Sequence, residues 1–463
     1  MILSKTIPNS AKKIAKRFAS PLPLIFRMGK KYQETKGFIQ NAQWWDKDKI
    51  EEWQLQRLGH IVKYAYENVS GYHVLYKEAG VKPEDIQTLS DVACLPFVTK
   101  AMIRDNLASF TSRVIPKSKQ IYGTTSGSTG MPFGFHYTEL NKSIEKAFMY
   151  SGWERAGWRL GESSAVLKGA SFVGSEEKFW EYDPYNRQLL LSSYYLTERT
   201  YDKYVAKILE YKAPYLQAYP SAATILADLI SKRADTGKLN FKAILLSSEN
   251  VYDWQRQKLF EAFVRSKLFG WYGLTEQVIL APECEYSHQY HVWPFYGFTE
   301  ILSEKGEEQE EGEIGELVGT SFWNYATPFI RYRTMDLAKK GKSGCEKCTR
   351  QFQLLEKIQG RLQEIIVTNT GRYISMTAMT VHSDAFHNVE QFQFYQDRPG
   401  RVSFRIVRRG NYTERDTSKI RSDLMTKLGE DMELEIIFVD KILRTPNGKY
   451  RVLEQELKIK YGE

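Results

Sequence analysis

Short apolar runs alternate with amphipathic stretches through the middle of the chain, from about residue 120 to residue 292. Three of these runs have the length of buried strands: Ala165–Leu167, Leu189–Leu191 and Ala243–Leu246. Helices are predicted between and beside them, at 139–151, 198–212, 221–235 and 252–265. Continuous apolar strands that alternate with helices are typical of an α/β fold with a largely parallel or mixed sheet.

The flanking regions have different patterns. Residues 32–110 place apolar side chains three and four positions apart, for example Leu55, Leu58, Ile61 and Val62, and this spacing predicts helices. After residue 292 the runs are those of strands. An acidic run at 304–313 separates two of them, and we expect it to be a solvent-exposed hairpin loop.

A domain boundary is expected near Gly360–Arg361. Beyond it the chain contains strand-like runs at 364–368, 391–395, 402–407 and 433–439. A helix predicted at 414–428 carries an apolar stripe that includes Ile420 and Leu424. The fold class predicted is therefore α/β, with a large N-terminal α/β domain of mixed sheets (residues 32–361) and a small C-terminal α+β domain (residues 362–463) on a hinge.

The formal net charge of +9 is concentrated at the N-terminus. Residues 1–31 hold Lys and Arg side chains but no acid, so the rest of the chain is close to neutral and no nucleic-acid surface is expected. The apolar runs of this basic amphipathic segment are too short to span a bilayer. It can lie on an anionic membrane surface, and the alternative is a solvated first helix packed on the body.

Four cysteines in so long a chain argue against a disulfide framework and for a reducing compartment. We therefore predict a cytoplasmic protein, at most peripheral on the inner face of the cell membrane. Cys94, isolated before Leu95 and Pro96, is expected in the core. No oligomeric state is predicted.

The other three cysteines suggest a metal site. Cys345 and Cys348 form a CxxC pair, and Cys284 lies upstream, followed by His288 and His291. Three thiolates and one imidazole form a suitable tetrahedral set for structural Zn²⁺. We favour His291 over His288 as the fourth ligand because it precedes a predicted strand.

One loop is rich in hydroxyls and glycine: Thr124, Thr125, Ser126, Gly127, Ser128, Thr129 and Gly130, followed by Met131 and Pro132. Backbone N–H groups and hydroxyls that converge in such a loop can bind an anion. No Lys follows Gly130, so this is not the Walker pattern. A flexible surface linker is the alternative.

Four further stretches carry candidate chemistry: Trp271–Glu276, Phe329–Asp336, Gly360–Ser375 and Pro446–Arg451. The first combines aromatic rings and a carboxylate, which can stack a base and hold a hard cation. The second combines two Arg and an Asp, which suit phosphate and ribose hydroxyls. Alone, the first stretch is also consistent with an ordinary strand-end turn, the second with a surface ion-pair ladder and the fourth with a solvent-exposed Lys. The third lies at the domain boundary, where a hinge is expected.

Taken in order, these stretches closely resemble the adenylate-forming superfamily, and within it the phenylacetate–CoA ligase-like family, including its branch associated with capsular polysaccharide biosynthesis. The resemblance covers nearly the whole chain and includes Leu95–Lys100 near its start. It implies a ligase that adenylates a small-molecule carboxylic acid with ATP and Mg²⁺. The acyl group then passes to an acceptor, by default coenzyme A.

The same resemblance implies residue roles. The loop from Thr124 to Pro132 would hold the β- and γ-phosphates of ATP. The other nucleotide contacts would come from Ser248, Glu249, Tyr272 and Gly273 around the adenine, Asp336 on the ribose hydroxyls, and Arg361 near ribose and phosphate. Thr275 would contact phosphate or carboxylate, and Glu276 would hold Mg²⁺.

Lys449 matches the lysine that bridges the carboxylate and the α-phosphate during adenylation. Its place on a separate domain lets it leave after the first half-reaction. A rotation at the hinge residue Gln363 would then present Gly371 and Arg372 to the second nucleophile. Relatives often carry Asp or Lys where this chain has Gln363, so the second half-reaction is less firmly implied than adenylation.

The acid pocket is expected at the carboxyl ends of the parallel strands, with candidates Tyr150, Trp153, Lys168, Tyr219, Pro220, Trp271 and Gly273. Most of them are aromatic, and aromatic side chains are also typical of a core. Lys168 is the most informative candidate, because a charge at a strand end can recognise a polar or acidic acyl group.

Two other functions fit the sequence. One keeps adenylation but delivers the acyl group to an amine or hydroxyl, for example of a sugar nucleotide or glycolipid, and the basic N-terminal segment favours it. The other is a catalytically silent, membrane-associated scaffold. Retention of Thr275, Glu276, Asp336 and Lys449 argues against the scaffold.

Overall fold

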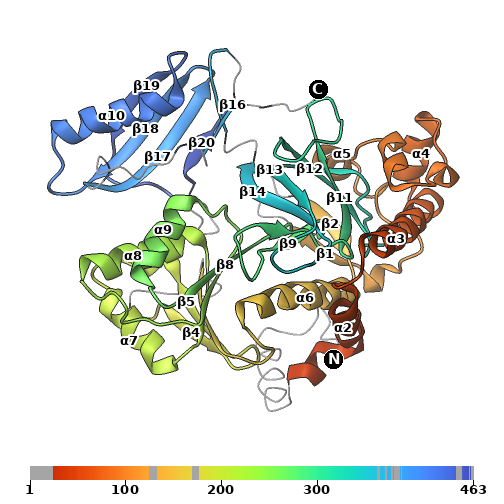
Figure 1. Cartoon of the computed structure of the whole chain (residues 1–463), viewed down its shortest axis with the longest axis horizontal. Coiled ribbons are helices and arrows are strands. Elements are labelled where there is room, and N and C mark those ends of the chain that lie inside the picture. The colour runs from red at the N-terminus through yellow and green to blue at the C-terminus, as the bar shows by residue number, and fades with distance from the viewer. Residues whose placement is uncertain are drawn as a thin grey trace.

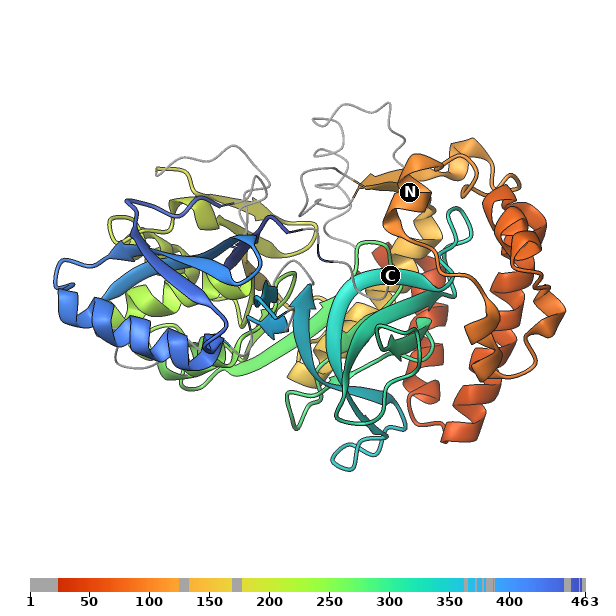
Figure 2. The ribbon, with the colours of Figure 1, turned by 90° about the horizontal axis from the view of Figure 1, so that it is seen from above.

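The structure is a computed structural model that describes residues 24–124, 133–168, 177–361, 365–370, 373–376, 379, 386, 388–444, 451–457 and 459. It has the predicted fold class, with a large α/β region followed by a small α+β region (Figure 1). The helices are α2 Leu24–Ala42, α3 Lys47–Asn68, α4 Ser70–Glu78, α5 Lys100–Asp105, α6 Glu139–Trp153, α7 Tyr201–Tyr211, α8 Pro220–Lys232, α9 Asp253–Ala262 and α10 Glu414–Leu428. In both views the small region lies beside α8 and α9 and away from α3 and α4 (Figure 2).

The largest sheet has seven strands in the order β4-β5-β3-β6-β7-β8-β9. They are β3 Ser164–Lys168, β4 Trp180–Asp183, β5 Gln188–Ser192, β6 Tyr215–Ala218, β7 Ala243–Leu246, β8 Lys267–Gly273 and β9 Leu280–Pro282. Strands β5, β3, β6, β7 and β8 are parallel, and β4 and β9 pair antiparallel at the two edges. The carboxyl ends of the parallel strands therefore meet at one edge, which is where α/β proteins place ligands.

Strand β7 shows why the predicted strands are wholly apolar. Ile244 and Leu246 pack into the core formed with α7, α8 and α9. Ala243 and Leu245 point to the opposite face and pack with Trp153 at the end of α6. A parallel sheet covered on both faces requires apolar residues at every position, so the predicted run has the same bounds as β7.

The second sheet is antiparallel, in the order β10-β14-β13-β12-β11. Its strands are β10 Tyr290–His291, β11 Gly297–Leu302, β12 Ile314–Ser321, β13 Tyr332–Ser343 and β14 Gln353–Arg361. The acidic run between β11 and β12 is a largely exposed loop, as predicted. A separate hairpin of β1 Ile121–Thr124 and β2 Gly134–Tyr137 pairs Thr124 with Gly134.

The small C-terminal region has a four-stranded sheet in the order β19-β18-β17-β20, with α10 packed on it. The strands are β17 Val389–Arg398, β18 Arg401–Arg408, β19 Glu433–Phe438 and β20 Leu453–Gln455, preceded by the pair β15 Ile365–Val367 and β16 Tyr373–Ser375. Helix α10 has the predicted bounds, and Ile420, Leu424 and Leu428 are fully buried. Its start is fixed by Asp416, which accepts a hydrogen bond from the N–H of Thr413 at 2.8 Å.

Helix α2 runs through the boundary expected after residue 31. Met28 and Tyr32 are buried in one cluster with Phe148 of α6, so the end of the basic segment packs on the body. Within the described residues, no helix is both long enough and apolar enough to cross a membrane. The prediction for Cys94 was wrong: it is exposed, because it ends the 3₁₀ turn Leu89–Cys94, in which Val92 takes the buried position.

Candidate active site and metal cluster

Several predicted site residues gather at the carboxyl edge of the large sheet. Lys168 is the last residue of β3, and its Nζ donates to Ser247 Oγ, just beyond β7, at 3.3 Å. The same Nζ lies 5.6 Å from the centroid of the Tyr219 ring, just beyond β6. The structure therefore brings two acid-pocket candidates, Lys168 and Tyr219, next to each other at this edge.

Ser248 and Glu249 follow at the same edge. The carboxylate of Glu249 accepts hydrogen bonds from the N–H of Ser221 at 2.9 Å and from its hydroxyl at 3.0 Å. Ser221 lies in the first turn of α8, so Glu249 caps that helix and complements its positive end. The carboxylate thereby holds the segment predicted to lie beside adenine against α8.

Tyr272 and Asp336 are in direct contact although they come from different sheets. The Tyr272 hydroxyl donates to Asp336 Oδ2 at 2.7 Å, and Asp336 is 4% exposed. Asp336 also pairs in the sheet with Arg361, whose side chain lies outside the described atoms. The residues predicted for adenine and for ribose therefore meet at one place.

The turn after β8 carries Thr275 and Glu276. It is closed by the N–H of Gln277, which donates to the carbonyl oxygen of Leu274 at 3.0 Å. Thr275 is exposed, whereas Glu276 is buried and its Oε1 accepts from the Tyr332 hydroxyl at 3.0 Å. Tyr332 was quoted in the sequence motif but given no role; its phenol orients the carboxylate predicted to hold Mg²⁺.

Sequence analysis missed Glu145 on α6. Its Oε2 accepts from Gln277 Nε2 at 2.6 Å, which ties α6 to the turn of Glu276. Burial raises the pKa of Glu145 to about 7, and the hydrogen bond from Gln277 only partly opposes this. No local sequence signal connects residues so far apart in the chain.

Strained backbone lies beside these side chains. Ser248, Gln277, Arg331 and Met335 all have positive φ, at 71°, 60°, 46° and 63°. Residues other than glycine rarely adopt this region, and when they do they cluster at functional sites. Each of the four is in or next to a stretch predicted to bind nucleotide or metal.

The two arginines near Asp336 form ion pairs within their sheet. Arg331 Nη2 lies 2.8 Å from Glu300, and Arg333 Nη2 lies 2.6 Å from Glu316. Arg331 also donates to the carbonyl oxygen of Leu95 at 2.8 Å. Both arginines therefore form largely buried ion pairs and not the surface ladder that was the alternative, and Asp336 is the residue of this stretch that contacts Tyr272.

Several predicted residues lie outside the described residues: Thr125, Ser126, Gly127, Ser128, Thr129, Gly130, Gln363, Gly371, Arg372 and Lys449. Thr124 is described and ends β1 opposite Gly134, so the hairpin β1–β2 leads into and out of the predicted phosphate loop. The roles of these residues stay predictions.

Three of the remaining acid-pocket candidates, Tyr150, Trp153 and Trp271, belong to an aromatic cluster, whereas Pro220 is the buried first residue of α8. The ring centroid of Tyr150 lies 4.7 Å from that of Trp158 and 5.3 Å from that of Trp153. Trp271 packs against the same cluster, and a Cβ at Gly273 would lie 2.7 Å from its ring. Gly273 therefore makes room for the Trp271 ring, and these aromatic side chains pack against one another as core residues do.

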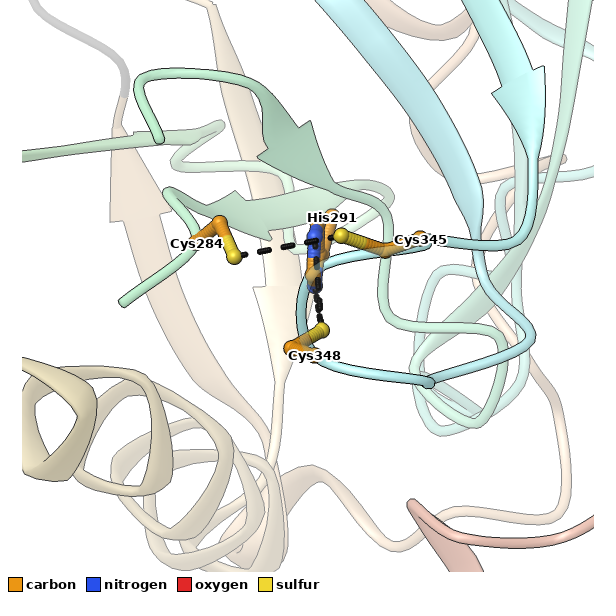
Figure 3. A group of neighbouring side chains, drawn as sticks. All are labelled: Cys284, His291, Cys345 and Cys348. Carbon is orange, nitrogen blue, oxygen red and sulfur yellow. Dashed lines mark hydrogen bonds between the residues drawn. The ribbon is translucent and has the colours of Figure 1, made fainter. Parts of the chain in front are cut away.

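The predicted metal ligands come together (Figure 3). Cys284, His291, Cys345 and Cys348 are all buried, and their ligand atoms lie within 4.8 Å of one another. The Sγ atoms of Cys284 and Cys345 are 3.9 Å apart, as are Cys348 Sγ and the ring nitrogens of His291. A tetrahedral Zn²⁺ with Zn–S bonds of about 2.3 Å places its sulfur ligands about 3.8 Å apart, so the four residues fit this ion.

The charges around the cluster also fit a metal–thiolate centre. Burial and the charges of Arg155 and Arg350 lower the pKa of His291 to about 2, which keeps the imidazole in its neutral, metal-binding form. Arg155 is buried, and among the described atoms its Nε and Nη2 have no hydrogen-bond partner. Three thiolates with Zn²⁺ carry one net negative charge, which this guanidinium offsets.

His288, the alternative ligand, is used elsewhere. Its Nδ1 lies 3.2 Å from Glu283, which is fully buried and also pairs with Arg256. His288 is thereby directed away from the cysteines, and the preference for His291 agrees with the geometry.

Known proteins resemble the chain in sequence and in fold. Residues 366–456 match the CapK C-terminal domain. A phenylacetate-coenzyme A ligase of Pseudomonas putida is 28% identical over 329 residues, covering 69% of this chain and 72% of that protein. Protein CapK of Staphylococcus aureus is 23% identical over 418 residues, covering 88% of this chain and 89% of that protein.

Among solved structures, 2-hydroxyisobutyryl-CoA ligase in the postadenylation state, in complex with R3-HIB-AMP, has a similar fold. The TM-score is 0.69 at 19% sequence identity, covering 89% of this chain and 90% of that one. Sequence and fold thus agree with the resemblance carried by the motifs. The chain is similar in sequence to phenylacetate-coenzyme A ligases and to Protein CapK, and it has the fold of an adenylate-forming ligase.

Proposed function

We propose that the protein is an AMP-forming acid ligase that activates a small-molecule carboxylic acid with ATP and Mg²⁺. The observation that carries the proposal is the contact between Tyr272 and Asp336 beside the turn of Glu276. A ring that can stack on a base, an acceptor for ribose hydroxyls and a cation ligand are brought together there. This set matches the needs of a bound nucleotide.

In the first half-reaction, a carboxylate oxygen of the acid bonds to the α-phosphorus of ATP and pyrophosphate leaves. Both reactants are anionic, so positioning and charge neutralisation determine the rate. Glu276, oriented by Tyr332, would hold Mg²⁺, which neutralises phosphate charge when bound. Thr275 and the loop Thr124–Gly130 would hold phosphate oxygens, and Lys449 would contact the carboxylate and the α-phosphate.

In the second half-reaction, the thiol sulfur of coenzyme A bonds to the acyl carbonyl carbon. AMP leaves with the electron pair of the broken C–O bond, and the thiol proton is released. Rotation about Gln363 would replace Lys449 at the site with the face that carries Gly371 and Arg372. Coenzyme A is proposed as the acceptor because phenylacetate-coenzyme A ligases are among the relatives.

A second acceptor is favoured by a different observation. Residues 366–456 match the CapK C-terminal domain, and the match to Protein CapK covers more of the chain than the match to the ligase does. In this alternative the acyl group passes to an amine or hydroxyl of a sugar nucleotide or glycolipid. Contact of residues 1–31 with an anionic membrane would suit a glycolipid acceptor.

We also propose that Cys284, His291, Cys345 and Cys348 hold one structural Zn²⁺. Four protein ligands complete the coordination shell, which is typical of structural rather than catalytic zinc. The support is the convergence of the four buried side chains, together with the buried charge of Arg155, whose Nη1 donates to the carbonyl oxygen of Glu283 while its Nε and Nη2 have no partner among the described atoms. Zinc bound there would fasten the loop between β13 and β14 to the segment that follows β9.

The direct test is a screen for acid-dependent exchange of pyrophosphate into ATP, over aryl, fatty, amino and sugar acids. The proposal predicts exchange with at least one class, and loss of about a hundredfold in E276Q. AMP release that requires coenzyme A would identify the acceptor, and release that requires an amine or hydroxyl compound would favour the alternative. A folded protein that shows no exchange with any class would support the scaffold instead.

A further inference from the structure

Arg444 connects the small C-terminal region to the large one. It lies in the segment after β19, and a residue just before it fixes this segment to the small region. The N–H of Ile442 donates to Gln391 Oε1 on β17 at 3.4 Å, and the Ile442 side chain is 9% exposed. The backbone that carries Arg444 therefore moves with the small region.

The guanidinium of Arg444 contacts the large region at Ser193. Its Nη1 donates to the Ser193 carbonyl oxygen at 2.8 Å and lies 3.3 Å from Ser193 Oγ. Ser193 is 1% exposed, and its neighbour Ser192 is fixed by the Tyr204 hydroxyl, which donates to its carbonyl oxygen at 2.5 Å. A charged donor on a rigid, buried acceptor makes a strong and directional hydrogen bond.

This contact lies at the edge of the sheet that carries the candidate active site. Ser192 ends β5 and pairs in the sheet with Lys168, the polar candidate of the acid pocket. Lys449 follows Arg444 closely in sequence, and an extended chain spans at most about 3.5 Å per residue. Chain length alone therefore keeps Lys449 within about 18 Å of the Arg444 backbone. The contact with Ser193 holds Arg444, from which that distance is counted, at the sheet edge.

A second contact between the two regions is apolar. Tyr252 is buried in the core cluster of the small region, and the ring centroids of Trp254 and Phe392 lie 5.9 Å apart. Apolar ring contacts are not directional and tolerate sliding. The Arg444 bond to Ser193 is directional, so it selects one rotation of the small region on this apolar surface.

We propose that Arg444 is a positioning residue for adenylation. Its bond to Ser193 holds the small region in the rotation that brings Lys449 to the acid and ATP, and the bond breaks when the small region turns for acyl transfer. This inference rests on the proposed function, because Arg444 would act by positioning Lys449, whose role belongs to the proposed adenylation.

The kinetic test compares R444A with wild type, using an acid that supports exchange. The kcat of pyrophosphate exchange is expected to fall at least about tenfold, while the KM for ATP changes less than about twofold. Acyl transfer from added acyl adenylate is expected to remain, and R444K to recover some of the exchange. R408A is the matched control, because Arg408 is exposed and stacks on Phe438 within the small region.

Unchanged exchange in R444A, or equal losses of exchange and transfer, would overturn the proposal. A wild-type protein without pyrophosphate exchange would refute the proposed function and not the role of Arg444. A second measurement therefore tests that role without any substrate. Spin labels at F260C and S422C, in a C94S background that removes the exposed cysteine, report the rotation of the small region. We expect R444A, but not R408A, to broaden the distance distribution; identical distributions in all three proteins would refute the role.

Discussion

The two ends of the β13–β14 hairpin are built differently. At the turn, Cys345 and Cys348 are buried in the metal cluster, and the backbone closes on itself through Cys345 N–H to Arg350 O at 2.8 Å. At the other end, Met335 has positive φ, and the pairing shifts register just beyond Asp336 and Leu337.

The two ends of this one hairpin therefore suit different roles, a structural one at the turn and a functional one at the opposite end. The turn, which we call the metal end because it carries two of the predicted zinc ligands, is closed: Cys345 and Cys348 are at most 6% exposed, which suits a structural role. The opposite end presents Asp336 to Tyr272 on a strained backbone, as functional sites often do. Zinc bound at the metal end would clamp the turn of the hairpin, whereas the opposite end keeps its strained backbone at the candidate active site.

The largest expected effect comes from breaking the metal end. C345S removes one thiolate, so zinc affinity falls and the free energy of unfolding is expected to drop by about 4 kcal/mol or more. Zinc analysis and urea unfolding measure the two effects. C94S, at an exposed cysteine, should change stability by less than about 0.5 kcal/mol. Equal behaviour of the two variants would refute the clamp.

The next effect concerns the tie between α6 and the turn of Glu276. Burial raises the pKa of Glu145 from 4.5 to about 7, so the folded state holds this proton more tightly than the unfolded state does. Stability from this group is therefore present at low pH and is lost as pH rises from 4.5 to about 7. The loss amounts to about 3 kcal/mol.

E145Q cannot ionise, so its stability should fall less than that of wild type over the same pH range. Urea unfolding of both proteins at about pH 5 and about pH 8 measures the difference. Gln can still accept the hydrogen bond from Gln277, so the tie itself is kept. Parallel pH dependence in the two proteins would show that Glu145 does not carry the effect.

Removal of the Asp336 charge, at the strained end of the hairpin, should lower the rate of pyrophosphate exchange without changing the zinc content. D336N is expected to lower pyrophosphate exchange about a hundredfold, because the ribose hydroxyls lose a charged acceptor. Its zinc content should equal that of wild type. E304Q, in the exposed acidic loop, is the control. A loss below about threefold in D336N would contradict the assignment.

The smallest expected effects distinguish the roles of two tyrosine hydroxyls, those of Tyr272 and Tyr332, near Asp336. Y272F removes the hydrogen bond to Asp336 but keeps the ring, so the KM for ATP should rise about fivefold. Y332F removes the bond to Glu276 and should instead raise the Mg²⁺ concentration required for half-maximal rate. If both variants changed the same parameter, the two roles would not be separable.

The sequence predicted best those elements that local patterns determine. Helix α10 was predicted with its bounds from its regular apolar stripe, and the structure shows that Thr413 and Asp416 cap its start. Strand β7 was predicted because burial on both faces makes it continuously apolar. The CxxC pair and His291 were predicted from ligand chemistry, and the four buried ligand atoms do converge.

The features that the sequence analysis missed depend on contacts between segments that are distant in the chain. The hydrogen bonds between Glu145 and Gln277 and between Glu276 and Tyr332 join different elements, and Glu145, Gln277 and Tyr332 do not stand out in their own segments. Cys94 was placed in the core because cysteine is usually buried, but the 3₁₀ turn exposes it. Helix α2 continues across the boundary expected after residue 31 because its apolar face packs against α6.

The most direct test of the central claim is acid-dependent pyrophosphate exchange in wild type and K449A, both with zinc content verified. We predict exchange in the wild type with one class of acid, and a loss of at least about a hundredfold in K449A at unchanged zinc content. Exchange in K449A equal to that of the wild type would contradict the account, as would no exchange by the folded wild type with any acid.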